Sequence, residues 1–216
     1  KKSGKVEAIA PQVRAVVAKA MNLAQLRRSA NADKRVAILF YNYPPGEKNL
    51  SASFMNLPKS LANTLAAMKA AGYRTEALDE ASLTRDLGSL LAAFYRDGQL
   101  QPLLDAGMAD WLPMTEYKRW FETQSPAFRE QVITRWGEPE ASSMASRYKG
   151  VAGFVIPRLQ VGNVSFMLVP PRGDRKDSAE AAIYHSSKES LNHFYMAAYL
   201  WARSNRDALV HFGTHG

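Results

Sequence analysis

The sequence predicts an α/β protein with a mostly parallel sheet and flanking helices, arranged in Rossmann-like layers, as part of a larger multidomain protein. Two apolar runs of strand length, 35–41 and 164–169, are continuous rather than alternating. Continuous apolar runs are typical of strands buried on both faces in a parallel sheet. Stretches with the spacing of amphipathic helices lie between these runs. Because the chain begins with Lys1 and stops at Gly216, we interpret it as an internal piece of a longer protein.

Three segments are expected along the chain. Residues 1–34 form a helical lead-in, since apolar residues recur at helical spacing from Val6 to Arg28. Residues 35–150 form an α/β unit with a helical insertion, and residues 151–216 form a second α/β segment that ends in a truncated site motif. The elements expected in these two segments are strands at 35–41, 73–78, 154–156, 164–169 and 208–212 (the last one buried), and helices at 57–71, 80–95, 114–121, 126–136 and 191–203.

Aromatic residues crowd the helical insertion. Core packing between helices is the favoured interpretation, because aromatic side chains dominate protein cores. The alternative is a wall for a flat macrocycle. The residues concerned are Trp111, Tyr117, Trp120, Phe121, Phe128 and Trp136.

Composition excludes several kinds of site. The chain has no cysteine, so disulfides, thiolate metal sites and cysteine nucleophiles are excluded. Any metal chemistry must then use His, Asp, Glu or water. The net charge of +8 is spread along the chain, which favours an anionic small ligand over nucleic acid. No P-loop motif occurs and no apolar stretch is long enough to span a membrane, so we expect a cytoplasmic protein that does not bind ATP through this chain.

Three polar loops, 42–49, 170–173 and 213–216, follow expected strands. If those strands are parallel neighbours, the loops share one rim of the sheet, where α/β proteins build their sites. Arg172 is held between two prolines and a glycine, which suits bidentate binding of a carboxylate. A solvent-facing loop arginine is an equal alternative for this residue.

All four histidines lie after residue 184. His211 and His215 would be about 13 Å apart on a straight strand, so they could bind one metal only if the neighbouring glycines turn the chain. One buried structural histidine and one loop histidine is an equally favoured interpretation of this pair. His193 begins an expected helix, where a capping role is the simpler one, and His185 follows a short apolar run.

The run Arg35–Gly46 resembles a signature of the large subunit of cobaltochelatase and of its relative, the porphyrin-binding subunit of magnesium chelatase. The tyrosine-asparagine-tyrosine form of this run is more similar to cobaltochelatase. The chain departs from the family at 190–192, where Ser, Leu and Asn replace prolines, and it stops before a glutamate that the family carries next. Further motifs in family order are Ser60-Leu61, Gly72-Tyr73, Leu112-Pro113, Tyr117, Trp120-Phe121, Arg135 to Pro139, Gly162 to Val164, Pro170 to Gly173, Tyr184-His185, His193 to Tyr195, Tyr199, Trp201 and His211 to Gly216.

The resemblance implies insertion of Co²⁺ into hydrogenobyrinic acid a,c-diamide in cobalamin biosynthesis. ATP would be hydrolysed by AAA+-type partner subunits, integrin-I-like subunits would be further partners, and this piece alone is expected to be inactive. The alternatives are a magnesium chelatase-type subunit, with Mg²⁺ and a porphyrin, and a non-catalytic tetrapyrrole-binding or scaffold module. The residues implied in the site are His211, His215 and His193 for catalysis, His211, His215 and His185 for the metal, and Arg172, Tyr43 and Asn42 for the macrocycle.

Overall fold

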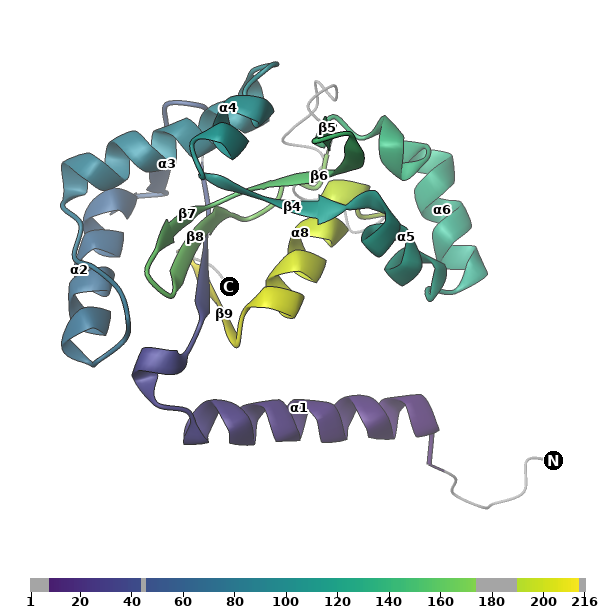
Figure 1. Cartoon of the computed structure of the whole chain (residues 1–216), viewed down its shortest axis with the longest axis horizontal. Helices are drawn as coiled ribbons and strands as arrows, with labels where there is room; N and C mark the ends of the chain where they lie inside the picture. The colour runs from purple at the N-terminus through teal and green to yellow at the C-terminus, as the bar shows by residue number, and fades with distance from the viewer. Residues whose placement is uncertain (1–7, 44–45, 174–189, 214–216) are drawn as a thin grey trace.

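The computed structural model describes residues 8–43, 46–173 and 190–213 (Figure 1). Its α-helices are α1 (Ala10–Arg28), α2 (Leu57–Ala70), α3 (Glu80–Tyr95), α4 (Leu100–Asp105), α5 (Met114–Glu122), α6 (Pro126–Trp136) and α8 (His193–Asn205). Its strands are β1 (Val36–Phe40), β2 (Ser51–Ala52), β3 (Met55–Asn56), β4 (Ala109–Pro113), β5 (Ala145–Tyr148), β6 (Val151–Pro157), β7 (Leu159–Val161), β8 (Val164–Leu168) and β9 (Ala208–Phe212).

The main sheet has the strand order β7-β8-β1-β9. The central strand β1 pairs in parallel with both β8 and β9, whereas β7 pairs antiparallel with β8. Every residue of β1 and β8 is buried, as the continuous apolar runs predict. The expected mostly parallel sheet is therefore correct for three strands, and the antiparallel edge strand β7 makes the sheet mixed.

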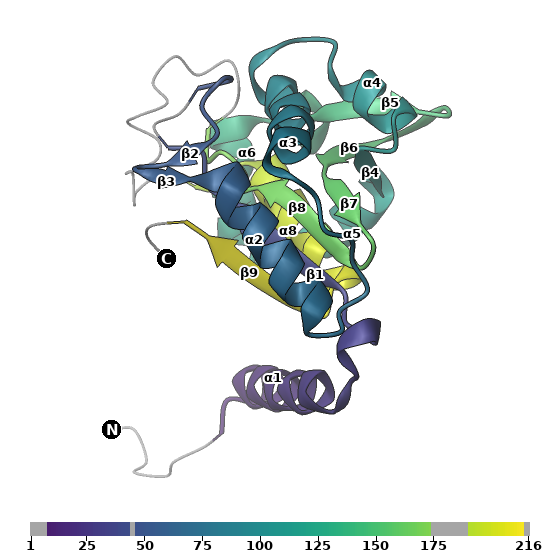
Figure 2. The ribbon, with the colours of Figure 1, turned by 90° about the vertical axis from the view of Figure 1, so that its left-hand side faces the viewer.

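Helices cover both faces of this sheet. Helices α2 and α3 lie on one face and α8 lies on the other (Figures 1 and 2). From β1 the chain reaches β8 on one side, and from β8 it crosses through α8 to β9 on the opposite side of β1. The strand order thus reverses between β1 and β9, which makes the gap between their carboxyl ends the topological switch point of the sheet.

A second sheet of three antiparallel strands, β4-β6-β5, belongs to the insertion with α5 and α6. This sheet is a further correction to the mostly parallel expectation. The expected boundary between segments at 150/151 falls between paired strands: β5 and β1 precede it, and their partners β6 and β8 follow it. The division into segments at 150/151 stays a prediction, but neither sheet is confined to one segment.

The segment expected as a strand at 73–78 is extended but is not part of a sheet. Gly72 ends α2 with a φ of +82°, as expected for a helix C-cap. Beyond it, the Arg74 carbonyl accepts from Asn163 N, and Thr75 Oγ1 donates to the Val161 carbonyl. These hydrogen bonds reach the β7–β8 turn rather than the length of a strand, so no ladder forms.

Two apolar elements are more exposed than the sequence suggests. The sequence predicts that β9 is buried, but this strand lies at the edge of the sheet among the described residues, and Leu209 and Val210 are 40% and 42% exposed. Helix α1 forms as expected, yet none of its residues is buried. The sequence analysis does not include α4, β4 and β5, which are four to six residues long.

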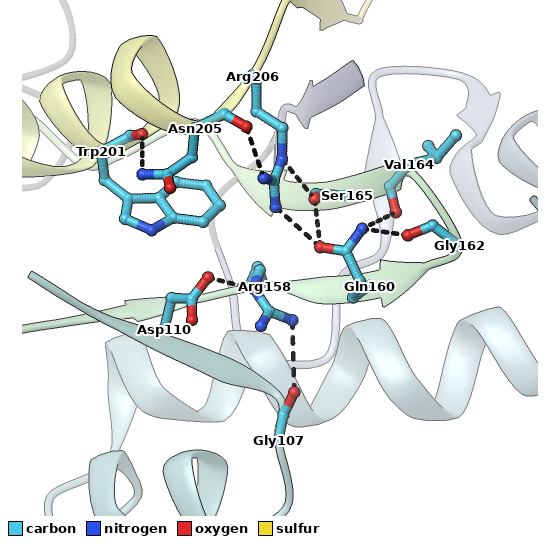
Figure 3. Close-up of polar contacts among 10 residues, drawn as sticks. All are labelled: Gly107, Asp110, Arg158, Gln160, Gly162, Val164, Ser165, Trp201, Asn205 and Arg206. Atoms are coloured by element: carbon cyan, nitrogen blue, oxygen red, sulfur yellow. Dashed lines mark hydrogen bonds and ion pairs between the residues drawn. The ribbon is translucent and has the colours of Figure 1, made fainter. Parts of the chain in front are cut away.

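Two separate polar groups lie near the end of α8, one centred on Arg206 and one on Arg158 (Figure 3). Arg206 Nε donates to Ser165 Oγ at 2.9 Å and its Nη2 donates to Gln160 Oε1 at 2.8 Å. Ser165 is fully buried in β8. Arg158, between β6 and β7, pairs with Asp110 of β4 at 2.9 Å. Burial, followed by the nearby charge of Arg158, lowers the pKa of Arg206.

Candidate functional site

The carboxyl ends of β8, β1 and β9 lie side by side, because the three strands are parallel neighbours. The described residues that directly follow these strands therefore start from one rim, as expected. Tyr41 follows β1, Arg172 follows β8 and Gly213 follows β9. A candidate site is built at this rim, at the switch point between β1 and β9.

His211 of β9 is held by Tyr199 of α8. The Tyr199 hydroxyl lies 2.8 Å from His211 Nε2, and the two rings meet edge-on at 82°. Burial, followed by a side-chain hydrogen bond with Tyr195, raises the pKa of Tyr199, so its hydroxyl remains a neutral phenol near pH 7. Because Nε2 is engaged, Nδ1 of this exposed histidine is the nitrogen left for a metal or a proton, with no hydrogen-bond partner among the described residues.

Two further tyrosines complete a group that we call the tyrosine–histidine cluster: Tyr41, Tyr195, Tyr199 and His211. The rings of Tyr195 and Tyr199 lie 5.0 Å apart at 31°. A Cβ at Gly213 would lie 2.9 Å from Tyr41 Cδ2, so a glycine is needed where β9 passes Tyr41. The charge of Arg172 acts on Tyr199 and opposes the rise in its pKa, which places a cation within electrostatic reach of the cluster.

An apolar groove of about 360 Å³ lies beside the cluster, on the outer side of α8. Tyr195 and Tyr199 belong to both the groove and the cluster. The other large side chains that line it include Trp120, Phe128, Leu191 and Arg203. The aromatic insertion therefore divides: Tyr117 and Phe121 are core residues, 0% and 5% exposed, whereas Trp120 and Phe128 face a groove.

His193 lies apart from the cluster, in the interior between α5 and α8. Its Nε2 lies 2.9 Å from the Gly137 carbonyl and its Nδ1 lies 2.8 Å from the Tyr117 hydroxyl. Since a carbonyl can only accept, Nε2 carries the hydrogen and Nδ1 accepts from the tyrosine, which fixes a neutral tautomer. Burial lowers the pKa of His193, outweighing the Gly137 hydrogen bond that raises it. The structure does not bring His193 to His211, and the catalytic role of His193 stays a prediction.

The start of α8 is tied to the loop that carries Arg172. Asn192 caps the helix by accepting from Tyr195 N at 2.7 Å. Its Nδ2 donates to the carbonyls of Pro171 and Gly173. Asn192 is one of the three residues at 190–192 that depart from the pattern of the resembled family, and its three hydrogen bonds hold the start of α8 against this loop.

The other predicted macrocycle residues point elsewhere. Asn42 is buried, and its Nδ2 donates to the Gly46 carbonyl and to the Tyr95 hydroxyl, towards α3 rather than α8. Tyr43 is 51% exposed and pairs through its backbone with the Ser51–Ser53 segment. Their roles in binding stay predictions.

The predicted metal site falls largely on undescribed positions, since His185 and His215 lie outside the described residues. No group of three or more potential metal ligands occurs within residues 8–43, 46–173 and 190–213. The same part of the chain contains no helix with the length and apolarity needed to cross a membrane.

Comparison with known protein families matches residues 1–216 to the family described as CobN/Magnesium Chelatase. The chain belongs to the CobN/magnesium chelatase family. It is 32% identical over 89% of its length to the aerobic cobaltochelatase subunit CobN of Pseudomonas aeruginosa, and 29% identical over 95% to a magnesium-chelatase subunit of Rhodobacter capsulatus. It also matches the solved catalytic subunit of cobaltochelatase from Mycobacterium tuberculosis, with a TM-score of 0.68 and 30% identity over 93% of this chain.

The chain spans only about 15–16% of the length of these CobN and magnesium chelatase relatives. The family that the sequence motifs suggested is confirmed. The choice between cobalt and magnesium is not resolved, because relatives of both kinds match at similar identity.

Sequence reasoning misses part of the cluster in this member of the CobN/magnesium chelatase family. Tyr41 and Tyr195 stand out only as parts of motifs, and nothing in the sequence predicts that Tyr199 contacts His211. The available signal is position: Tyr41 directly follows a buried strand, and Tyr195 and Tyr199 are four residues apart, on one face of a helix.

Proposed function

We propose that this chain is one part of the large, tetrapyrrole-binding subunit of a cobaltochelatase. In this proposal the subunit inserts Co²⁺, its substrate metal, into hydrogenobyrinic acid a,c-diamide in cobalamin biosynthesis. ATP is hydrolysed by AAA+-type partner subunits rather than by this chain, and integrin-I-like subunits are further partners. Family membership supports the chelatase reaction. The matches to CobN proteins, together with the tyrosine-asparagine-tyrosine run at 41–43 of this chain, favour cobalt.

The observation that carries this proposal is the tyrosine–histidine cluster at the switch point between β1 and β9. A chelatase must hold a flat polycarboxylate ring, replace water around the metal and accept protons from the ring nitrogens. Aromatic side chains suit a flat ring, an arginine suits carboxylates, and an imidazole suits both a late first-row metal and a proton. Tyr195, Tyr199, Arg172 and His211 bring these chemistries to one rim.

In this mechanism, Nε2–H of His211 donates to the Tyr199 oxygen, which is the tautomer that leaves the Nδ1 lone pair available. Nδ1 then accepts a proton from the macrocycle or binds the entering ion. Arg172 attracts the carboxylates that surround the ring, assisted by the positive charge of the chain. Histidines and carboxylates outside the described residues would complete the site.

A magnesium chelatase-type subunit is the second candidate. It is favoured by the match to the magnesium-chelatase subunit of Rhodobacter capsulatus over 95% of the chain. In this case the same cluster would serve Mg²⁺ and a porphyrin.

Binding of the two tetrapyrroles separates the candidates. The full-length subunit that contains this chain is titrated with hydrogenobyrinic acid a,c-diamide and with protoporphyrin, and the dissociation constants are measured by absorbance or fluorescence quenching. We expect the corrin precursor to bind about tenfold or more tightly, a preference of roughly 1.4 kcal/mol. Preference for the porphyrin would support the second candidate, and binding of neither would exclude both.

A further inference from the structure

Helix α1 carries an apolar seam that nothing in the described chain covers. Ile9, at the helix N-cap, is followed by Val13, Val16, Ala20 and Leu23 at alternating spacings of four and three residues. The four large residues of this seam are between 47% and 68% exposed. Apolar residues with this alternating spacing, β-branched at several positions, form the contact seam between two packed helices.

The seam faces away from the rest of the domain. Leu23, the last seam residue, borders one of the hollows beside α8 and β9, and the other residues of α1 that line these hollows include Ala15, Ala18, Asn22 and Leu26. At 100° per residue this set lies on the opposite side of the helix from Val13, Val16 and Ala20. Figures 1 and 2 agree that α1 lies to one side of the fold, near the start of β1 and away from the candidate site.

Contacts with the domain do too little to stabilise α1. None of its 19 residues is buried, and its N-cap residue makes no side-chain hydrogen bond. Helices of this length are marginal in water without an amphipathic face packed against something. A covering surface therefore has to supply the packing that the domain does not.

The charges on α1 indicate the chemistry of that surface. Between Ala10 and Arg28 there are four cations, Arg14, Lys19, Arg27 and Arg28, and no acidic residue. A second copy of the same helix would meet it with like charges. Helices that lie on membranes commonly use aromatic residues and leucine on the apolar face, whereas this seam is mainly valine, isoleucine and alanine. The occupant that fits is a helix with an apolar seam and acidic flanks.

We propose that α1 docks, through the seam of Ile9, Val13, Val16, Ala20 and Leu23, onto an acidic amphipathic helix in the part of the large subunit outside these 216 residues. The proposal rests on the chain being one part of a longer subunit, as its coverage of 15–17% of its curated relatives indicates. It does not depend on which metal or tetrapyrrole the subunit uses.

Hydrogen exchange in the full-length subunit tests the docking. We expect the amides of α1 to be protected to a similar degree as those of α8. Val16→Glu, at a position 68% exposed in this chain, should speed exchange across α1 by roughly tenfold or more. A glutamate in the seam prevents docking, so local unfolding of α1 no longer has to break the contact with the partner helix. Gln25→Glu makes the same charge change off the seam and should leave exchange unaltered. The exchange of β1 checks that both variants keep the fold.

Three results would overturn the proposal. The first is free exchange of α1 in the wild-type subunit, or an equal effect of Val16→Glu and Gln25→Glu. The second is a change of oligomeric state in Val16→Glu by analytical ultracentrifugation, which would make a second copy the occupant. The third is protection that arises only when vesicles containing an anionic lipid are added, which would make a membrane the occupant. Protection that is unaffected by protein concentration and by vesicles supports the proposal.

Discussion

At the scale of single residues, two histidines are each bound by a tyrosine but are in opposite environments. The Tyr117 hydroxyl is hydrogen-bonded to Nδ1 of the buried His193, and Nε2 of the same ring donates to the Gly137 carbonyl. Tyr199 meets the exposed His211, whose Nδ1 is left for chemistry. The sequence predicts that the histidines include site residues, but it does not predict which histidine is buried and which is exposed at the site. The decisive partner of His193 is 76 residues away, so burial could not be inferred locally.

The buried histidine has a consequence for pH dependence. Because burial lowers the pKa of His193 below its ordinary value of 6.5, the unfolded state takes up this proton before the folded state does. The free energy of unfolding should therefore fall as the pH is lowered from about 7 through 6.5 towards the folded-state pKa. Chemical denaturation at a series of pH values measures this slope.

Two variants test whether His193 causes this pH dependence of the free energy of unfolding. His193→Gln should be less stable at pH 7 and should have a shallower fall in stability on acidification. His211→Gln, at an exposed position, should keep the wild-type slope. An unchanged slope in His193→Gln would contradict the assignment.

At the scale of elements, the sequence predicts the longer helices well and the short strands of the second sheet poorly. The expected bounds of α3 and α6 coincide with the observed helices, and each helix begins after a capping side chain, Asp79 or Ser125. Strands β4 and β5 pair with β6 in a small sheet whose partners are set by the insertion as a whole. Both strands contain charged residues, so neither is a continuous apolar run like β1 or β8, and no strand signal marks them in the sequence.

The β7–β8 hairpin depends on one glycine. Gly162 has a φ of +60°, and a Cβ there would lie 2.3 Å from the Arg74 carbonyl oxygen. Gly162→Ala should lower the free energy of unfolding by about 2 kcal/mol or more, since left-handed backbone strain adds to a backbone clash. Gly98→Ala, where φ is also positive but no atom lies within 4 Å, isolates the strain. Equal losses in the two variants, measured by denaturation, would refute the role of the clash.

At the scale of the whole molecule, the two sheets share one apolar core, and Arg206 ties the end of α8 to β7 and β8 of the main sheet. The parallel order β8-β1-β9 could be predicted in part, since buried apolar strands followed by polar loops indicate a shared rim. The edge position of β9 and the outward seam of α1 could not. The apolar patterns of β9 and α1 indicate surfaces that pack against something, but they do not show whether the packing partner belongs to this chain.

Arg206 is expected to stabilise the contact between the end of α8 and strands β7 and β8. Arg206→Met should cost about 2–3 kcal/mol, because it leaves the fully buried Ser165 and the amide of Gln160 without their charged donor. Arg203→Met, on an exposed arginine of the same helix, should change stability by less than about 0.5 kcal/mol. Denaturation midpoints compare the two, and a neutral Arg206→Met would show that the network adds no stability.

The central claim is that His211, held by Tyr199 at the switch point, takes part in metal insertion. The most direct measurement is the rate of Co²⁺ insertion by the reconstituted chelatase carrying His211→Ala in its large subunit. We expect the rate to fall about a hundredfold or more, as for loss of a proton-transfer group, while the free energy of unfolding and tetrapyrrole binding stay close to wild type. Insertion at the wild-type rate by His211→Ala would contradict the claim.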